Sequence, residues 1–99
     1  MRKKLSPVLG YVDRRFQLVC VLCILSAHPS YASKLKEQLK AKFNLDVKYS
    51  RVYHWLWALE RDGYAQSALA LKSGHLIREY KMTHEGRVYL VEVIKFLEG

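Results

Sequence analysis

Five polar or basic side chains are grouped near the middle of the chain. Lys48, Tyr49, Ser50 and Arg51 are consecutive, and His54 follows within one helical turn. An arginine holds guanine through two hydrogen bonds, whereas the other four residue types contact bases or phosphates. If a helix begins here, its first turns present all five side chains to a groove of DNA. A basic helix face that is only solvated has the same composition, so the alternative stays open.

A second basic group surrounds a predicted hairpin turn at Lys72, Ser73 and Gly74, with His75 and Arg78 after it. Such a tip would lie against the flanking DNA backbone or the minor groove, although ordinary polar turn residues look alike. The expected DNA-binding residues are Lys48, Tyr49, Ser50, Arg51, His54, Lys72, His75 and Arg78. A basic N-terminal arm, residues 1–12, contains Arg2, Lys3 and Lys4, which either follow the phosphate backbone or take no part.

Other chemistries find little support in the residue pattern. The sequence contains no serine-nucleophile motif, phosphate-binding loop or paired carboxylates, so no catalytic residue is predicted. The four histidines lack the spacing of metal ligands, and Cys20, Cys23 and His28 would supply three ligands where structural zinc sites use four. We therefore expect no enzyme, no metal and no cofactor, and no small-molecule effector is evident.

Charge narrows the class of partner. Seventeen lysines and arginines against nine acidic residues give a formal net charge of +8 over 99 residues. Nucleic acid, an anionic membrane surface and an acidic protein are all compatible with that excess. The longest apolar run, residues 18–25, is far shorter than the roughly 20 residues of a membrane span. The chain is therefore expected to be soluble and cytoplasmic, without a membrane partner.

The periodicity of apolar residues predicts the elements that position these groups. A first helix is expected over about 13–27, apolar on nearly every face, followed by a helix that Ser30 caps and that ends near Phe43. A third helix is expected over about 48–62, with Trp55 in the core and Trp57 projecting from the opposite side. Two strands, at about 64–71 and 75–82, and a last helix capped by Thr83 complete the order.

Two linked motifs give this order a family resemblance. Residues 52–64, VYHWLWALERDGY, resemble the recognition helix of PadR-type regulators, and residues 78–86, REYKMTHEG, resemble their second wing strand and following helix cap. The resemblance is to the PadR/MarR-like winged helix-turn-helix family. It implies a mostly helical α+β fold, the winged helix-turn-helix. We expect residues 13–99 to form one winged-helix DNA-binding domain that includes a C-terminal dimerisation helix.

The chain departs from the PadR pattern in two respects. It carries a single C-terminal helix in place of a long dimerisation domain, and Trp57 and Ala58 occupy positions where charged residues are usual. In size and composition it is similar to small winged-helix proteins of viruses that infect hyperthermophilic archaea. Its single asparagine and three glutamines also suggest a thermophilic source, with the host cytoplasm as the location if the protein is viral.

A homodimer is expected because one small domain cannot easily cover the all-apolar first helix and the stripe on the last helix. A two-fold axis would place the recognition helices about 34 Å apart on a near-palindromic site. The expected interface residues are Leu18, Cys20, Leu22, Cys23, Leu90, Val93, Ile94 and Leu97. Cys20 or Cys23 could meet its counterpart in a disulfide between subunits, whereas two reduced, buried thiols are the alternative.

Together these features predict a sequence-specific regulator of transcription that binds double-stranded DNA as a homodimer, with the third helix in the major groove. The alternative is a winged-helix module that binds a protein or RNA without sequence-specific DNA binding. The basic third-helix face favours DNA, and Trp57 favours the alternative. A membrane-surface role is disfavoured because the fold uses up the apolar residues.

Overall fold

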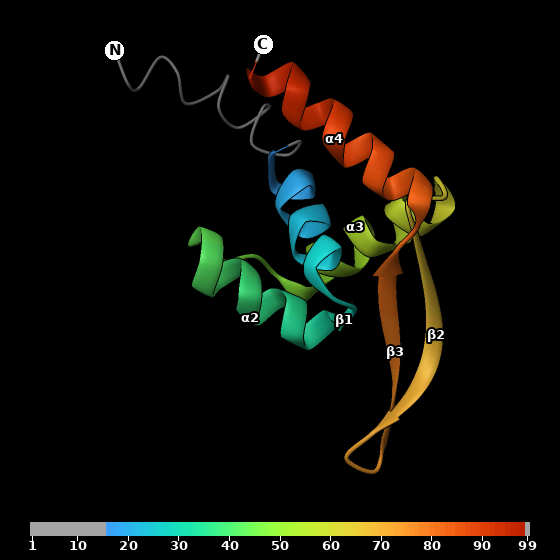
Figure 1. Cartoon of the computed structure of the whole chain (residues 1–99). Coiled ribbons are helices and arrows are strands. Elements are labelled where there is room, and N and C mark those ends of the chain that lie inside the picture. Colours follow the sequence, from blue (N-terminus) through green and yellow to red (C-terminus); the bar gives the residue numbers. More distant parts are fainter. Residues whose placement is uncertain (1–15, 99) are drawn as a thin grey trace.

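The computed structural model describes residues 16–98, apart from the side chain of Leu97. Helical residues 16–27 precede β1 (Ser30–Tyr31), α2 (Ala32–Phe43) and α3 (Tyr49–Arg61). The hairpin of β2 (Ala65–Lys72) and β3 (His75–Met82) then leads into α4 (His84–Glu98) (Figure 1). The predicted mostly helical α+β fold with a hairpin wing is confirmed. The predicted arm, residues 1–12, lies outside the described residues.

The helix at 16–27 is buried by its own chain. In Figure 1 it lies between α2 and α4, and its apolar side chains join one core with those of α2, α3 and Leu90 of α4. Cys20 and Leu22 are 1% and 0% exposed. A single chain therefore already removes these two predicted interface residues from solvent, so that no second subunit is needed to cover them. Leu18 and Cys23 are only partly buried.

The start of α2 differs from the prediction. Ser30 does not cap this helix: it lies in β1, opposite Tyr80 of β3, and its hydroxyl donates to Oε1 of Gln38 at 3.3 Å. Tyr31 is the N-cap residue and makes no side-chain capping bond. The sheet order is β1-β3-β2, so this short strand joins the base of the wing to the start of α2.

The buried stripe of α3 follows the predicted helical period. Val52, Leu56 and Leu59 are fully buried, at spacings of four and three residues that return to one face of the helix. Trp55 is also in the core, as predicted. After the helix, the positive φ of Gly63 (83°) lets the chain reverse, and the amide of Tyr64 donates to the carbonyl of Leu59 at 2.8 Å.

The register of the hairpin assigns each wing residue to one of two faces. Ser73 and Gly74 both have positive φ, 50° and 78°, as a tight two-residue hairpin turn requires. Opposite residues share a face, and Ser67 bonds to Glu60 of α3, so its face is turned toward α3. This inner face consists of Ala65, Ser67, Leu69, Leu71, Leu76, Arg78, Tyr80 and Met82. The outer face consists of Gln66, Ala68, Ala70, Lys72, His75, Ile77, Glu79 and Lys81.

Thr83 caps α4, as predicted. Its Oγ1 accepts a hydrogen bond from the amide of Gly86 at 3.0 Å and donates one to the carbonyl of Gly63 at 2.6 Å. The ring of Tyr89 stacks on that of Tyr64, with centroids 4.4 Å apart. The first turns of α4 are thus fastened to the turn between α3 and β2.

Candidate nucleic-acid interface

The first turns of α3 form a basic, solvent-exposed surface. Lys48 is the N-cap residue, and Tyr49, Ser50, Arg51 and His54 are all exposed. The structure describes every residue of α3. The first turn of this helix contains no acidic residue, and no side chain caps the N-terminus of the helix. The backbone amides there and the positive end of the helix dipole favour an anion such as a phosphate. The structure thus brings the five third-helix residues together on one accessible helix end.

Aromatic rings lie close to two cations in or beside this surface, Lys36 of α2 and Arg51 of α3. Nζ of Lys36 lies 5.4 Å from the ring of Tyr49 and 3.7 Å from the carboxylate of Asp46. The guanidinium of Arg51 lies 6.0 Å from the ring of Trp55. Such contacts restrict a long side chain at modest energetic gain. This arrangement could not be predicted from the sequence, because it depends on the packing of α2 against α3.

Trp57 projects from α3 as predicted, and 57% of it is exposed. The guanidinium of Arg61 lies 4.8 Å from its ring, and the imidazole of His54 lies 6.3 Å away. The ring therefore packs partly on its own helix. It separates His54, the last residue of the basic surface along α3, from the pair formed by Arg61 and Asp62, whose nearest atoms are 3.0 Å apart.

Internal bonds occupy two of the predicted wing contacts. Nζ of Lys72 lies 3.4 Å from Oε2 of Glu79, and both residues belong to the outer face. On the inner face, Nη1 of Arg78 donates to Oγ of Ser67 at 3.1 Å, and that hydroxyl donates to Oε2 of Glu60 at 2.8 Å. Lys72 and His75 therefore point away from α3, whereas Arg78 points toward it.

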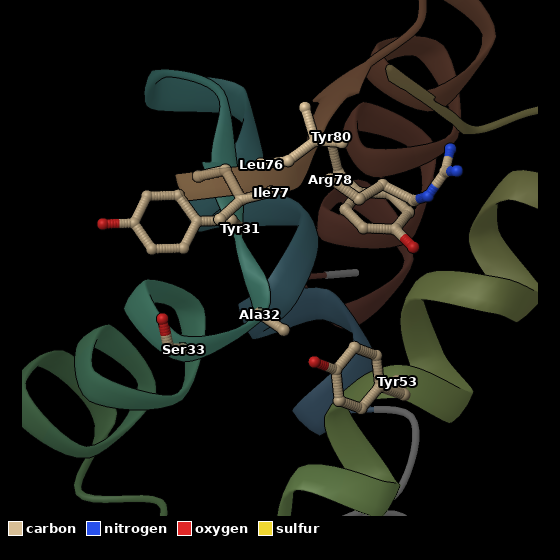
Figure 2. A pocket seen from close by; sticks show the side chains of 8 residues that line it. All are labelled: Tyr31, Ala32, Ser33, Tyr53, Leu76, Ile77, Arg78 and Tyr80. Atoms are coloured by element: carbon tan, nitrogen blue, oxygen red, sulfur yellow. The ribbon is translucent and has the colours of Figure 1, made fainter. Parts of the chain in front are cut away.

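A groove separates the wing from the two helices (Figure 2). Its volume is about 490 Å³, and its lining residues are Tyr31, Ala32, Ser33, Tyr53, Leu76, Ile77, Arg78 and Tyr80. Tyr53 of α3 points its hydroxyl toward the start of α2, whereas the ring of Tyr31 points away from α3. Burial and, to a smaller extent, the charge of Glu60 raise the pKa of the Tyr80 hydroxyl, so that it stays a neutral donor. Tyr31, Ser33 and Tyr53 are not among the predicted site residues.

The described residues provide little for other chemistries. No three His, Cys, Asp or Glu side chains among residues 16–98 gather into a potential metal site. None of the described helices is long and apolar enough to span a membrane.

The sequence profile of the transcriptional regulator PadR-like family matches residues 21–92, most of the chain. The chain belongs to the PadR-like family. This family consists of transcriptional regulators that bind DNA and not of enzymes, and the predicted resemblance to it is confirmed. Neither the resemblance to archaeal viral proteins nor a thermophilic source is supported. No curated protein sequence matches the chain.

Solved structures agree with the PadR-like fold. A transcriptional regulator from Clostridium thermocellum superposes with a TM-score of 0.80 at 22% identity, covering 88% of this chain and 84% of that one. A PadR family transcription regulator from Clostridium difficile gives 0.72 at 22% identity, covering 84% and 85%. A protein from Streptococcus mutans gives 0.75 at 27% identity, covering 83% and 76%.

The predicted interface residues of this PadR-like chain are only partly available to another subunit. On α4, Leu90 is buried in the core, Val93 is half-buried and Ile94 is exposed, while the side chain of Leu97 lies outside the described residues. Further apolar side chains, which the sequence analysis did not assign to an interface, are exposed nearby in sequence. These are Val88, Val91 and Phe96, the last of them 79% exposed.

Burial also bears on the predicted disulfide between subunits. Cys20 lies inside the core of its own chain, so a bridge through it would require the helix at 16–27 to leave that core. Cys23 is partly accessible, and burial raises the pKa of its thiol. A raised pKa lowers the fraction of the reactive thiolate. A disulfide between subunits therefore stays a prediction for Cys23 only.

Proposed function

We propose that the chain regulates transcription by binding double-stranded DNA sequence-specifically, with the start of α3 in the major groove. The observation that carries this proposal is the exposed group of Lys48, Ser50, Arg51 and His54 at an uncapped helix end. A helix fits the major groove, and the first residues of a recognition helix reach the base edges. The formal net charge of +8 supplies the attraction to phosphates.

Selection from a randomised duplex pool tests the proposal and needs no operator sequence to begin with. Repeated retention of duplexes by the protein, at increasing salt, should yield one enriched motif that binds roughly 10³-fold or more tighter than random DNA. Retention without an enriched motif would leave only non-specific binding. Failure to retain any duplex at low salt, or preferential retention of folded RNA added in parallel, would reject the proposal in favour of the RNA- or protein-binding alternative.

We further propose that the protein acts as a homodimer through α4. Val88, Val91, Ile94 and Phe96 expose apolar surface on this helix, and burying that surface against a second copy would be favourable, since a fully exposed side chain of this kind contributes about 1.5–3 kcal/mol and a partly exposed one less. This proposal replaces Cys20, Leu22 and Leu90 of the predicted interface by residues that solvent reaches. A dimeric mass by light scattering at micromolar concentration supports it, and a monomeric mass contradicts it.

A further inference from the structure

The inner face of the wing carries leucines where a DNA-binding wing is expected to carry charge. Leu71 and Leu76 are opposite one another beside the turn and are 72% and 67% exposed, and Leu69 on the same face is 58% exposed. The basic side chains of the tip, Lys72 and His75, belong to the outer face. The hairpin therefore turns an apolar end, and not a basic one, toward the side on which α3 lies.

The position of this apolar end relative to α3 indicates which part of a bound duplex it would contact. Ser67 and Arg78 connect the inner face to Glu60 of α3, and the groove of about 490 Å³ lies between that face and Tyr53. A duplex with α3 in its major groove has an adjacent minor groove, separated from it by one phosphate backbone. The groove has the place and the hydroxyl lining for that backbone. Leu76 is one of its lining residues (Figure 2), and Leu71 lies opposite Leu76 in the hairpin, beside the turn.

We propose that Leu71 and Leu76 insert into the minor groove, partly unstack a base step and bend the DNA. This inference rests on the proposed DNA-binding function and adds a mode of contact to it. Apolar wedges of this kind kink a duplex by about 20–90°. Arg78 on the same face, together with Lys72 and His75 behind it, supplies positive charge on both sides of the wedge, which suits DNA better than an apolar protein surface.

The wedge also predicts a sequence preference that hydrogen bonds from α3 do not explain. Pyrimidine–purine steps such as TA unstack most easily, whereas A-tracts are stiff. Sites flanked by a TA step at the position of the wing should therefore bind more tightly than sites with an A-tract there. The leucines would contact no base edge that distinguishes the two, so the preference would come from deformability.

The test uses a duplex of about 30 base pairs, selected by the protein from a randomised pool and labelled at its ends for energy transfer. The wild-type complex should show a bend of tens of degrees. The double variant Leu71→Ser, Leu76→Ser should bind roughly tenfold or more weakly and leave the duplex nearly straight, because the apolar contact is lost. The matched control Leu71→Met, Leu76→Met keeps the apolar volume and should keep the bend.

A second measurement needs only the wild-type protein. A 2-aminopurine placed at the TA step becomes brighter when it unstacks, so its fluorescence should rise in the complex, and a label at the centre of the α3 site should stay dim. An unchanged signal, or a serine variant that bends DNA like the wild type, overturns the wedge while DNA binding stands. A change of oligomeric mass in the serine variant without loss of bending would instead assign the leucines to a protein contact. If no duplex is retained at all, the proposed function itself fails.

Discussion

Gly86 lies where the first turn of α4 passes the backbone carbonyl of Tyr64. A Cβ built at this position would overlap the oxygen of that carbonyl, and backbone cannot move aside as a flexible side chain does. Alanine normally favours a helix over glycine, so the sign of this substitution depends on the contact. We expect Gly86→Ala to lower the free energy of unfolding by about 1–3 kcal/mol in urea denaturation. The neighbouring exposed Glu85→Ala is the control, and equal stability of both variants would show that the helix start has room.

Arg51 is the residue of α3 best suited to read a base. It is exposed on the first turn, where its guanidinium can hold guanine by two bonds. Arg51→Ala should weaken binding to the selected site by about 1–3 kcal/mol and relax the preference at one base pair. Arg87→Ala on α4 is the matched control. An equal loss on selected and random duplexes would make Arg51 a phosphate contact.

Cys23 provides a prediction that depends on pH. Because burial raises the pKa of its thiol, less thiolate is present at any given pH than in a free cysteine. Alkylation should therefore be slower than for a model thiol and should accelerate only at higher pH. Stability should fall as the pH rises past the ordinary thiol pKa, because the unfolded chain ionises first. Cys23→Ser should remove both effects. A bridge between subunits would appear as a dimer on a non-reducing gel of protein denatured with a thiol-blocking reagent.

At the scale of elements, the wing contributes charge separately from its leucines. Lys72→Gln with Arg78→Gln should weaken binding to all duplexes alike and flatten the dependence of affinity on salt, because fewer counterions are released. The internal bonds of these residues to Glu79 and Ser67 must rearrange or be shared with a phosphate. The slope of log affinity against log salt concentration should therefore change by less than the loss of two full phosphate contacts would give. Glu79→Gln, which frees Lys72 from its ion pair, should make affinity depend more steeply on salt concentration. An unchanged slope in the double variant would show that the wing stands clear of DNA.

The long, strongly periodic elements could be predicted from the sequence. Leu35 and Leu39 of α2 and Val52, Leu56 and Leu59 of α3 repeat at helical spacing and are buried as expected. Strand β1 is only two residues long, so it shows no detectable period. Its partner β3 also comes about fifty residues later, so no local pattern indicates the pairing. The inner face of the wing was equally hidden, because apolar residues occur on both faces of the hairpin, leucines on the inner face and Ala68, Ala70 and Ile77 on the outer face, and give little amphipathic signal.

At the scale of the whole molecule, the burial of the helix at 16–27 changes which surface is left for a second copy. Its apolar sequence predicts that a partner covers it, because apolar character identifies burial but not the chain that provides it. With Cys20 and Leu22 covered, the exposed apolar side chains of α4 become the interface candidates that we propose.

Introducing charge on α4 tests this assignment. Val91→Glu with Ile94→Glu should give a monomeric mass by light scattering, because a buried, unpaired charge opposes association. Affinity for a duplex with two half-sites should fall by about 10²-fold or more, while affinity for a single half-site should change little. Ala41→Glu, at an exposed position of α2, is the control for the mass. A dimer that persists in the double variant would place the interface elsewhere.

The short strand β1 supports the wing only at its base. β1 pairs with Glu79 and Tyr80 of β3, so from Arg78 to the turn the wing is a ribbon of two strands with one open edge on each. Backbone amides of such a ribbon open by local unfolding, at a cost that falls with distance from the core. Deuterium should therefore exchange slowly at Tyr80 and progressively faster toward Leu76. The wing is thus anchored only at its base, beside α2, and its tip is free. A bound duplex that slows exchange at the tip would restrict the motion of the whole hairpin.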